Sequence, residues 1–428
     1  MSKILISPLG TGTYSNKTPD RNYRVAKYCF EEKGTIYETP FMSAAISEYL
    51  DIDRVFLVGT QKSMWETVYE YYSKKTNSQF DEEYWYKLAG SIEEFNNNNN
   101  NTSIDKLELN RIERVIDQFI NNISDRSSKC FIIDYGMNEE ELWRNFDIFM
   151  KIFDCLEDGD EIYLDITHSF RSIPLFMYLM MNFATTLHKK NIELVSVYYG
   201  MFEVKNDLGH VPVVDLSPLF KISEWIRGVY DFLNYGNGYI ISNLIEDNKI
   251  SKNLENISDL LNINYLNGLK QQIKALDKNM KNIDKLNSPV FKYLFNDIIQ
   301  FVNRFKNIKS DALFQLEISS WYFENRRYSN GYICLVESII TFMCEINNFE
   351  INKFNKNRAK EMLFDKANDS EDIEELKYIF NAINKIRIDI AHATGPGDRS
   401  ASNIKYAKEK YYYDKVKKIF KSKKYHLE

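Results

Sequence analysis

Short apolar and β-branched runs alternate with helical patterns through the first half of the chain. We predict strands at residues 3–7, 24–30, 54–59, 129–135, 161–166 and 192–199. Helices are predicted between them, at residues 41–49, 63–73, 139–155 and 172–188. This alternation is typical of a mostly parallel sheet with crossover helices on its faces. The order predicts a doubly wound α/β domain of Rossmann-like type, closed by a hairpin near residues 201–214.

The second half of the chain shows only helical periodicity. Helices are predicted, among others, at residues 311–324, 331–346, 371–392 and 402–421. Pro218 follows the last strand pattern and marks the exit from the first domain. We therefore predict an α/β domain at residues 1–217, a helical linker at residues 218–305 and an all-α domain at residues 306–428.

Composition restricts the class of protein. The chain has 428 residues and is 44% hydrophobic, enough for several domains with their own cores. Its five cysteines include no CxxC pair and no metal-ligand spacing, which indicates reduced thiols and predicts no metal site. The longest apolar stretch, residues 173–187, falls short of the roughly 18 to 20 residues that cross a bilayer. The chain begins with a strand pattern rather than a signal peptide, so we expect a cytoplasmic protein with no membrane segment.

Two segments depart from the average composition. An asparagine run at residues 96–101 offers no apolar face and predicts a disordered surface insert. The net charge is -6, yet residues 401–428 carry nine lysines against three acidic residues. A lysine-rich helix of this kind is either a solvated face or a phosphate-binding one, and the residues leave both open.

Two predicted loops after strands carry polar groups and glycines. In an open parallel sheet, ligands bind beyond the carboxyl ends of the strands. The first loop combines glycines with hydroxyls: Gly10, Thr11, Gly12 and Thr13. The second opens a predicted helix, where free amides favour anions, and combines hydroxyl, imidazole and guanidinium groups: Thr167, His168, Ser169 and Arg171. An alternative stays open, in which Ser169 or Ser172 caps the helix and His168 packs against the sheet.

A second candidate site lies near the end of the chain. Arg387 and His392 close a helical pattern before a glycine-rich stretch that must end it. A histidine can exchange a proton with a ribose hydroxyl, and an arginine can stabilise charge on a phosphorane. Five residues turn an α-helix by about 140°, so a groove between two copies would be needed to gather both groups. The alternative is that Arg387 pairs with Asp389 or Glu374 and that His392 caps the helix.

The run Asp165-x-Thr167-His168-x-x-Arg171, with the Gly10–Gly12 loop and the helical second half, resembles the CARF (CRISPR-associated Rossmann-fold) sensors of type III CRISPR systems. More narrowly, it resembles their Asp-x-Thr-His-Gly subfamily, with Ser169 where that subfamily has glycine. The resemblance implies a homodimer, or a higher oligomer, that holds one cyclic oligoadenylate across its two-fold axis. Four adenylates fit better than six as a first expectation. This ligand is an allosteric activator, and no cofactor is expected.

The helical surroundings of Arg387 and His392 resemble the HEPN ribonuclease domain that follows CARF domains. The resemblance implies that this pair is catalytic, that the substrate is single-stranded RNA and that cleavage needs no metal. Products with 2',3'-cyclic phosphate ends are then expected. Ile388 stands where the family has a polar residue, and Asn384 is the candidate for a supporting role. Two other functions remain open: a ligand-binding regulator without nuclease activity, and a ring nuclease that degrades the cyclic ligand.

Overall fold

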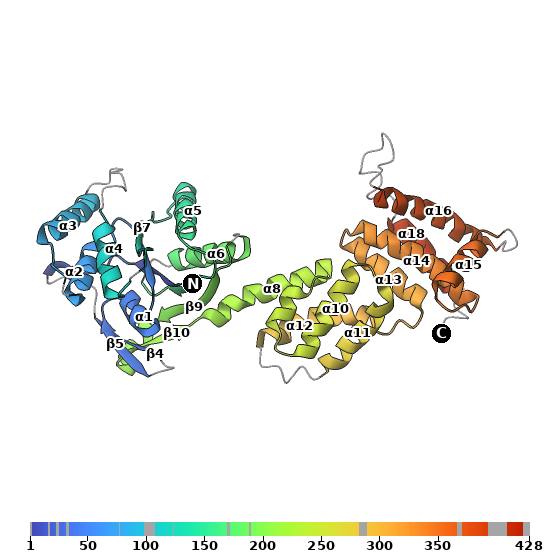
Figure 1. Ribbon diagram of the computed structural model, residues 1–428, viewed down its shortest axis with the longest axis horizontal. Coiled ribbons are helices and arrows are strands. Elements are labelled where there is room, and N and C mark those ends of the chain that lie inside the picture. Colours follow the sequence, from blue (N-terminus) through green and yellow to red (C-terminus); the bar gives the residue numbers. More distant parts are fainter. Residues whose placement is uncertain are drawn as a thin grey trace. The chain divides into compact units, whose positions relative to one another are not determined.

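The computed structural model describes residues 2–422 except 16–17, 23–24, 31–33, 77, 98–107, 123, 169–171, 188–189, 282–288, 366–369 and 393–408. The chain separates into two compact units, Met1–Phe220 and Lys221–Glu428 (Figure 1). The first unit ends close to the predicted exit at residue 217. The predicted boundary at residue 305 lies inside the second unit.

Within the described residues, the first unit contains a mixed sheet of eight strands in the order β5-β4-β10-β9-β8-β1-β6-β7. The strands are β1 Lys3–Leu9, β4 Ala26–Phe30, β5 Thr35–Thr39, β6 Arg54–Gly59, β7 Lys129–Ile132, β8 Glu161–Asp165, β9 Glu193–Gly200 and β10 Val211–Asp215. The five strands from β9 to β7 run parallel. The remaining pairs include antiparallel ones, β10 with β9 and β5 with β4. The predicted α/β architecture of this half is confirmed.

The order of the strands reverses at β1. The chain adds β6 and β7 on one side of β1 and returns to add β8 and β9 on the other side. Ile6 of β1 lies opposite Phe56 of β6 and opposite Leu164 of β8, and both pairings are parallel. The carboxyl ends of β1 and β8 therefore meet at one edge of the sheet, at the kind of position where open α/β sheets bind ligands.

Helices cover both faces of this sheet, as Figure 1 shows. One face packs against α1 Met42–Leu50, α2 Trp65–Lys75, α3 Glu82–Asn97 and α4 Asn110–Phe119. The other packs against α5 Glu139–Asp154 and α6 Ser172–Leu187. Leu5 belongs to the first cluster, whereas Ile4 and Ile6 belong to the second. Successive side chains of a strand point to opposite faces, so β1 supplies both cores.

The outer part of the sheet differs from the sequence prediction. The β9 and β10 strands do form the predicted antiparallel pair, but the short helices η2 Phe202–Val204 and α7 Lys205–Leu208 lie between them. The β5 strand and the small ribbon of β2 Thr13–Ser15 and β3 Thr18–Asn22 were not predicted, because their largely polar residues show no apolar alternation. Most of the predicted asparagine insert falls outside the described residues.

Every described element of the second unit is a helix, as predicted. The helices are α8 Ser217–Tyr235, α9 Tyr239–Leu244, α10 Asn248–Asn262, α11 Leu266–Met280, α12 Pro289–Phe305, α13 Asp311–Glu324, α14 Tyr328–Ile346, α15 Lys353–Leu363, α16 Glu371–Ala391 and α18 Glu409–Ser422. The first part of the helix predicted at residues 402–421 lies outside the described residues. No helix in the described ranges has the length and apolar character that crossing a bilayer requires.

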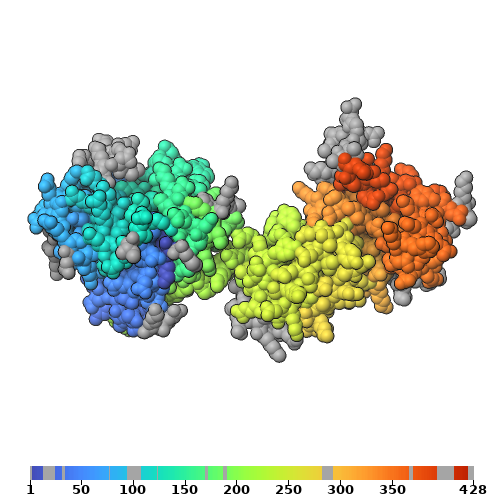
Figure 2. Space-filling view, viewed as in Figure 1, coloured from blue at the N-terminus to red at the C-terminus, as the bar shows by residue number. Residues whose placement is uncertain are grey.

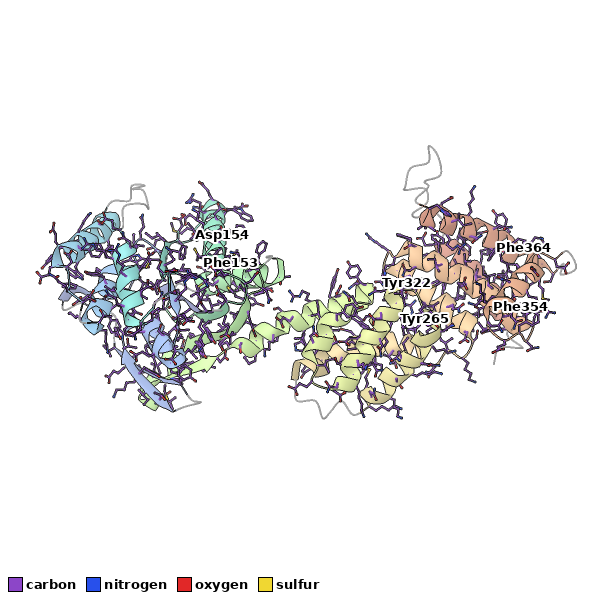
Figure 3. All side chains as sticks on the ribbon, viewed as in Figure 1. Phe153, Asp154, Tyr265, Tyr322, Phe354 and Phe364 are labelled. Atoms are coloured by element: carbon purple, nitrogen blue, oxygen red, sulfur yellow. The ribbon has the colours of Figure 1, made fainter. Side chains whose placement is uncertain are left out.

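Helix α13 takes part in two hydrophobic clusters of the second unit. Its Phe314, Ile318 and Trp321 pack with α8 to α12, while Ala312 and Leu316 pack with α14, α16 and α18. The buried Tyr322, labelled in Figure 3, lies on α13. Its hydroxyl donates a hydrogen bond of 2.8 Å to the carbonyl oxygen of Leu261 on α10. Figure 2 shows the surface of this unit in chain order, from yellow-green through orange to red. Helix α13 is therefore apolar around most of its circumference.

Candidate functional site

Asp165 ends β8 and is fully buried beneath the second predicted loop. Its carboxylate accepts hydrogen bonds from the Ser7 hydroxyl at 2.6 Å and from the Thr167 amide at 2.8 Å. Burial raises the pKa of Asp165 to about 6, although both hydrogen bonds act in the opposite direction. Because its two oxygens accept hydrogen bonds from β1 and from the loop after β8, Asp165 links the ends of these two adjacent strands.

Thr167 and His168 form hydrogen bonds to residues of two other strands, β9 and β4. The Thr167 hydroxyl accepts a hydrogen bond from the Gly200 amide at 2.9 Å, at the end of β9. His168 Nε2 lies 2.8 Å from the hydroxyl of Tyr28 on β4, and the His168 ring centre lies 5.4 Å from that of Phe202. Burial lowers the pKa of His168 to about 4. The imidazole is therefore neutral at physiological pH, so His168 offers a hydrogen-bonding ring and no positive charge.

The fold itself requires a glycine at position 12 of the first loop. The carbonyl of Gly10 accepts a hydrogen bond of 3.1 Å from the amide of Met64, which precedes α2. Gly12 has a φ of 69°, a conformation that favours glycine. A Cβ at this position would overlap the sulfur of Met64. Packing against Met64 therefore explains the loop geometry before any ligand is considered.

The structure describes only some of the other residues predicted for this site. Thr11 lies between the two glycines and is partly exposed. Thr13 begins β2, and its side chain is not described; Ser169 and Arg171 lie outside the described residues. The edge at β1 and β8 thus presents backbone groups, a threonine and a neutral imidazole. These groups suit hydrogen bonding to a polar ligand.

In the second unit, Arg387 and Asn384 lie one turn apart on α16 and line a hollow of about 410 Å³. The hollow lies among α14, α15 and α16. The Nε atom of Arg387 is buried and has no hydrogen-bond partner among the described residues. Glu374, the alternative partner for Arg387, pairs instead with Lys377 at 3.2 Å. Arg387 and Asn384, both predicted from the sequence, therefore share one site.

His392 is exposed and forms the C-cap of α16. Its amide donates to the carbonyl of Ile388 at 3.0 Å, so the last turn stays helical. A regular helix separates the directions of Arg387 and His392 by about 140°, and His392 does not line the hollow that Arg387 enters. The structure of one chain does not bring the predicted catalytic pair together, and its role stays a prediction.

Two groups of site residues were not found from the sequence. Ser7, Tyr28 and Gly200 hold the second loop, but they lie on strands far apart along the chain, and no local pattern links them to it. The second group consists of lysines on α15: Lys353, Lys356 and Lys360. Their i, i+3, i+7 spacing places them on one helix face, and this spacing in the sequence could have indicated a basic helix face.

Family models match both units. Residues 4–203 match the model of the CARF domain of the CRISPR system endoribonuclease Csx1. Residues 221–312 match the model of the second domain of the CRISPR-associated protein MJ1674.

Two known proteins are similar over most of the chain. The CRISPR-associated protein MJ1674 of Methanocaldococcus jannaschii is 42% identical over 403 residues, which cover 92% of this chain and 62% of that protein. The chain thus spans less than two thirds of the length of this curated relative. The structure of Enterococcus italicus Csm6 bound to cyclic hexa-2'-fluoro-hexa-dAMP has a TM-score of 0.42 and 12% identity, covering 100% of this chain and 96% of that one.

Proposed function

Because this chain belongs to the CRISPR-associated CARF proteins, we propose that it is an RNA endonuclease activated by a cyclic oligoadenylate in type III CRISPR antiviral defence. The observation that carries the proposal is the reversal of strand order at β1. The loops that follow β1 and β8, with Gly10 to Gly12 on the first and Thr167 and His168 on the second, leave adjacent parallel strands at the same edge. The ligand binds across these loops.

The described groups of this edge suit the uncharged parts of the ligand. The neutral His168 ring can donate or accept a hydrogen bond at an adenine or ribose, and Thr11 adds a hydroxyl. Arg171 is the candidate for pairing with a phosphate. A two-fold dimer presents these loops twice, which matches a ring with an even number of nucleotides, with four favoured over six.

RNA cleavage is assigned to Arg387 and His392. The ribose 2'-oxygen attacks the neighbouring phosphorus, and the bond from phosphorus to the 5'-oxygen breaks. His392 exchanges the proton of the attacking or leaving oxygen, and Arg387 stabilises the charge that develops on the phosphate. The products then carry 2',3'-cyclic phosphate and 5'-hydroxyl ends. Since the two side chains diverge on α16, the site is completed by a second copy of the chain in a homodimer.

The proposal is tested by incubating the full chain with labelled single-stranded RNA, EDTA and cyclic oligoadenylates of four or six nucleotides. We expect chelator-resistant cleavage that depends on one of these rings, with cyclic phosphate ends seen by mass spectrometry. A chain that binds a ring and leaves RNA intact would be a regulator. Loss of the ring itself would identify a ring nuclease.

A further inference from the structure

One face of each of three helices lines the hollow beside Arg387. Helix α15 contributes Lys353, Lys356, Asn357 and Lys360, which share one face through their i, i+3, i+4, i+7 spacing. Helix α16 contributes Phe380, Asn384 and Arg387 with the spacing i, i+4, i+7. Helix α14 supplies Val336, Glu337 and Ile340. Helices α15 and α16 therefore turn polar and basic positions toward one space, which α14 closes with two apolar residues and a glutamate.

The lining is strongly basic. Four basic side chains face a single carboxylate, that of Glu337. Glu337 pairs with Lys356 at 3.0 Å, while the Lys360 ammonium lies 5.7 Å from the centre of the Phe380 ring. Lys353 and Lys360 are exposed, and Nε of Arg387 is buried without a partner in the described part of the chain. The balance attracts an anion, and a buried guanidinium nitrogen gains a hydrogen bond when a phosphate oxygen enters.

The remaining lining suits a nucleobase and its sugar. Amides that can both donate and accept hydrogen bonds surround the space: Asn267, Asn352, Asn357 and Asn384. The nearly buried apolar groups of Val336, Ile340 and Phe380 form the floor of the space. The volume, about 410 Å³, lies at the lower end of the range typical of small-ligand pockets. This combination fits one nucleotide better than a bare inorganic ion.

A neighbouring aromatic residue indicates that the ligand is a single-stranded nucleic acid rather than a free nucleotide. Phe354 follows Lys353 on α15 and is 75% exposed (Figure 3). Its position is about 100° around the helix from Lys353, on the flank of the lysine face. Exposed aromatic rings beside basic grooves stack successive bases of single-stranded nucleic acids.

We propose that the hollow among α14, α15 and α16 holds a nucleotide of the RNA strand, with its phosphate on Lys353, Lys360 and Arg387. This inference rests on the proposed nuclease function and gives it a substrate-holding subsite. Arg387 then holds the phosphate whose developing charge it stabilises during cleavage, and His392 of a second copy completes the site.

The test measures binding separately from cleavage. A fluorescent single-stranded RNA with 2'-fluoro riboses lacks the attacking hydroxyl, and its affinity for the full chain is measured by anisotropy across a salt series. We expect the Lys353→Ala/Lys360→Ala double variant to bind about tenfold more weakly. The slope of log affinity against log salt should shrink by about 1.4, since each lost phosphate contact on a single strand accounts for about 0.7. Lys252→Ala, an exposed lysine of α10 outside the hollow, is the matched control and should bind like the wild type.

Each outcome separates this inference from the nuclease proposal. Unchanged affinity and slope in the double variant would overturn the subsite, whatever the cleavage assay shows. Weaker binding in the double variant supports the subsite even if no ring activates cleavage, in which case only the nuclease proposal fails. Displacement of the RNA by AMP at micromolar concentration would assign the hollow to a free nucleotide. It would overturn the proposal that the hollow holds part of an RNA strand.

Discussion

The carboxylate of Asp165 at the end of β8 accepts a 2.6 Å hydrogen bond from the hydroxyl of Ser7 on β1. This bond joins the two strands between which the sheet reverses its order. It also lies beneath the loop that carries Thr167 and His168. The geometry of the candidate ligand edge therefore depends on a buried acid that itself does not face the ligand.

Asp165 should make the stability of the first unit fall as pH rises from about 4 to about 6. Its pKa is about 6 when folded, against the ordinary value of 3.8, so the folded state binds more protons in this interval. Stability from this group is fully present below pH 4 and is lost as pH rises through 6. The loss amounts to about 3 kcal/mol, since one pKa unit corresponds to about 1.4 kcal/mol.

Urea unfolding of Asp165→Asn and wild type at pH 4, 5, 6 and 7 checks this expectation. The wild type should lose stability relative to the variant as the pH rises. Asp207→Asn, an exposed aspartate of α7, should follow the wild-type profile and serves as the control. Parallel profiles for wild type and Asp165→Asn would show that the carboxyl is not held in its buried, protonation-favouring environment.

Gly12→Ala should destabilise the first unit by about 2 to 4 kcal/mol. The positive φ costs about 1 kcal/mol for a residue with a Cβ, and overlap with the Met64 sulfur adds the cost of overpacking, about 1 to 3 kcal/mol. Gly209→Ala is a matched control, because Gly209 has a φ of 73° and nothing within 4 Å of its Cβ position. Thermal unfolding should show a clearly larger loss at Gly12, and equal losses would mean that Met64 does not restrict the loop.

The contribution of His168 to the affinity for the cyclic oligoadenylate should be nearly constant between pH 5.5 and 8. The pKa of His168 is about 4, so its ring stays neutral over this range. Tyr28→Phe removes the hydrogen bond to His168 and should weaken binding by about 0.5 to 1.5 kcal/mol. Calorimetric titration measures both effects, with Tyr86→Phe, an exposed tyrosine of α3, as the control. Binding that strengthens steeply below pH 7 in the Asp165→Asn variant as well would instead require a charged histidine at the ligand.

Arg387→Ala and His392→Ala should each lower ligand-activated RNA cleavage by about 10²-fold or more while affinity for the cyclic ligand survives. The two residues belong to the helical unit, whereas the ligand loops belong to the first unit. Arg387→Lys keeps the charge but loses the planar donor geometry, so it should recover only part of the rate. Single-turnover cleavage with saturating ligand is the measurement. Wild-type rates in both alanine variants would remove the pair from the chemistry.

The sequence predicted elements well where apolar residues were concentrated. The β6 strand was predicted to the residue, because all six of its residues are buried and Val55 to Val58 form one apolar run. The polar β5 strand was missed, since only its pairing with β4 makes it a strand. For the site, the motif located the loop after β8. It did not show that Asp165 is buried or that His168 is neutral, because both properties arise from strands distant in sequence.

The position of α13 bears on how the second unit can be dissected. A fragment that starts at residue 306 would keep α13 but lose the helices that cover Phe314, Ile318 and Trp321. Those side chains would meet water, at a cost of roughly 1.5 to 3 kcal/mol for each large apolar group. Such a fragment would associate through this face or fail to fold. Melting of α8 to α12 and of α14 to α18 should accordingly be one cooperative transition, and the proposed nuclease region should be expressed with the helices that precede it.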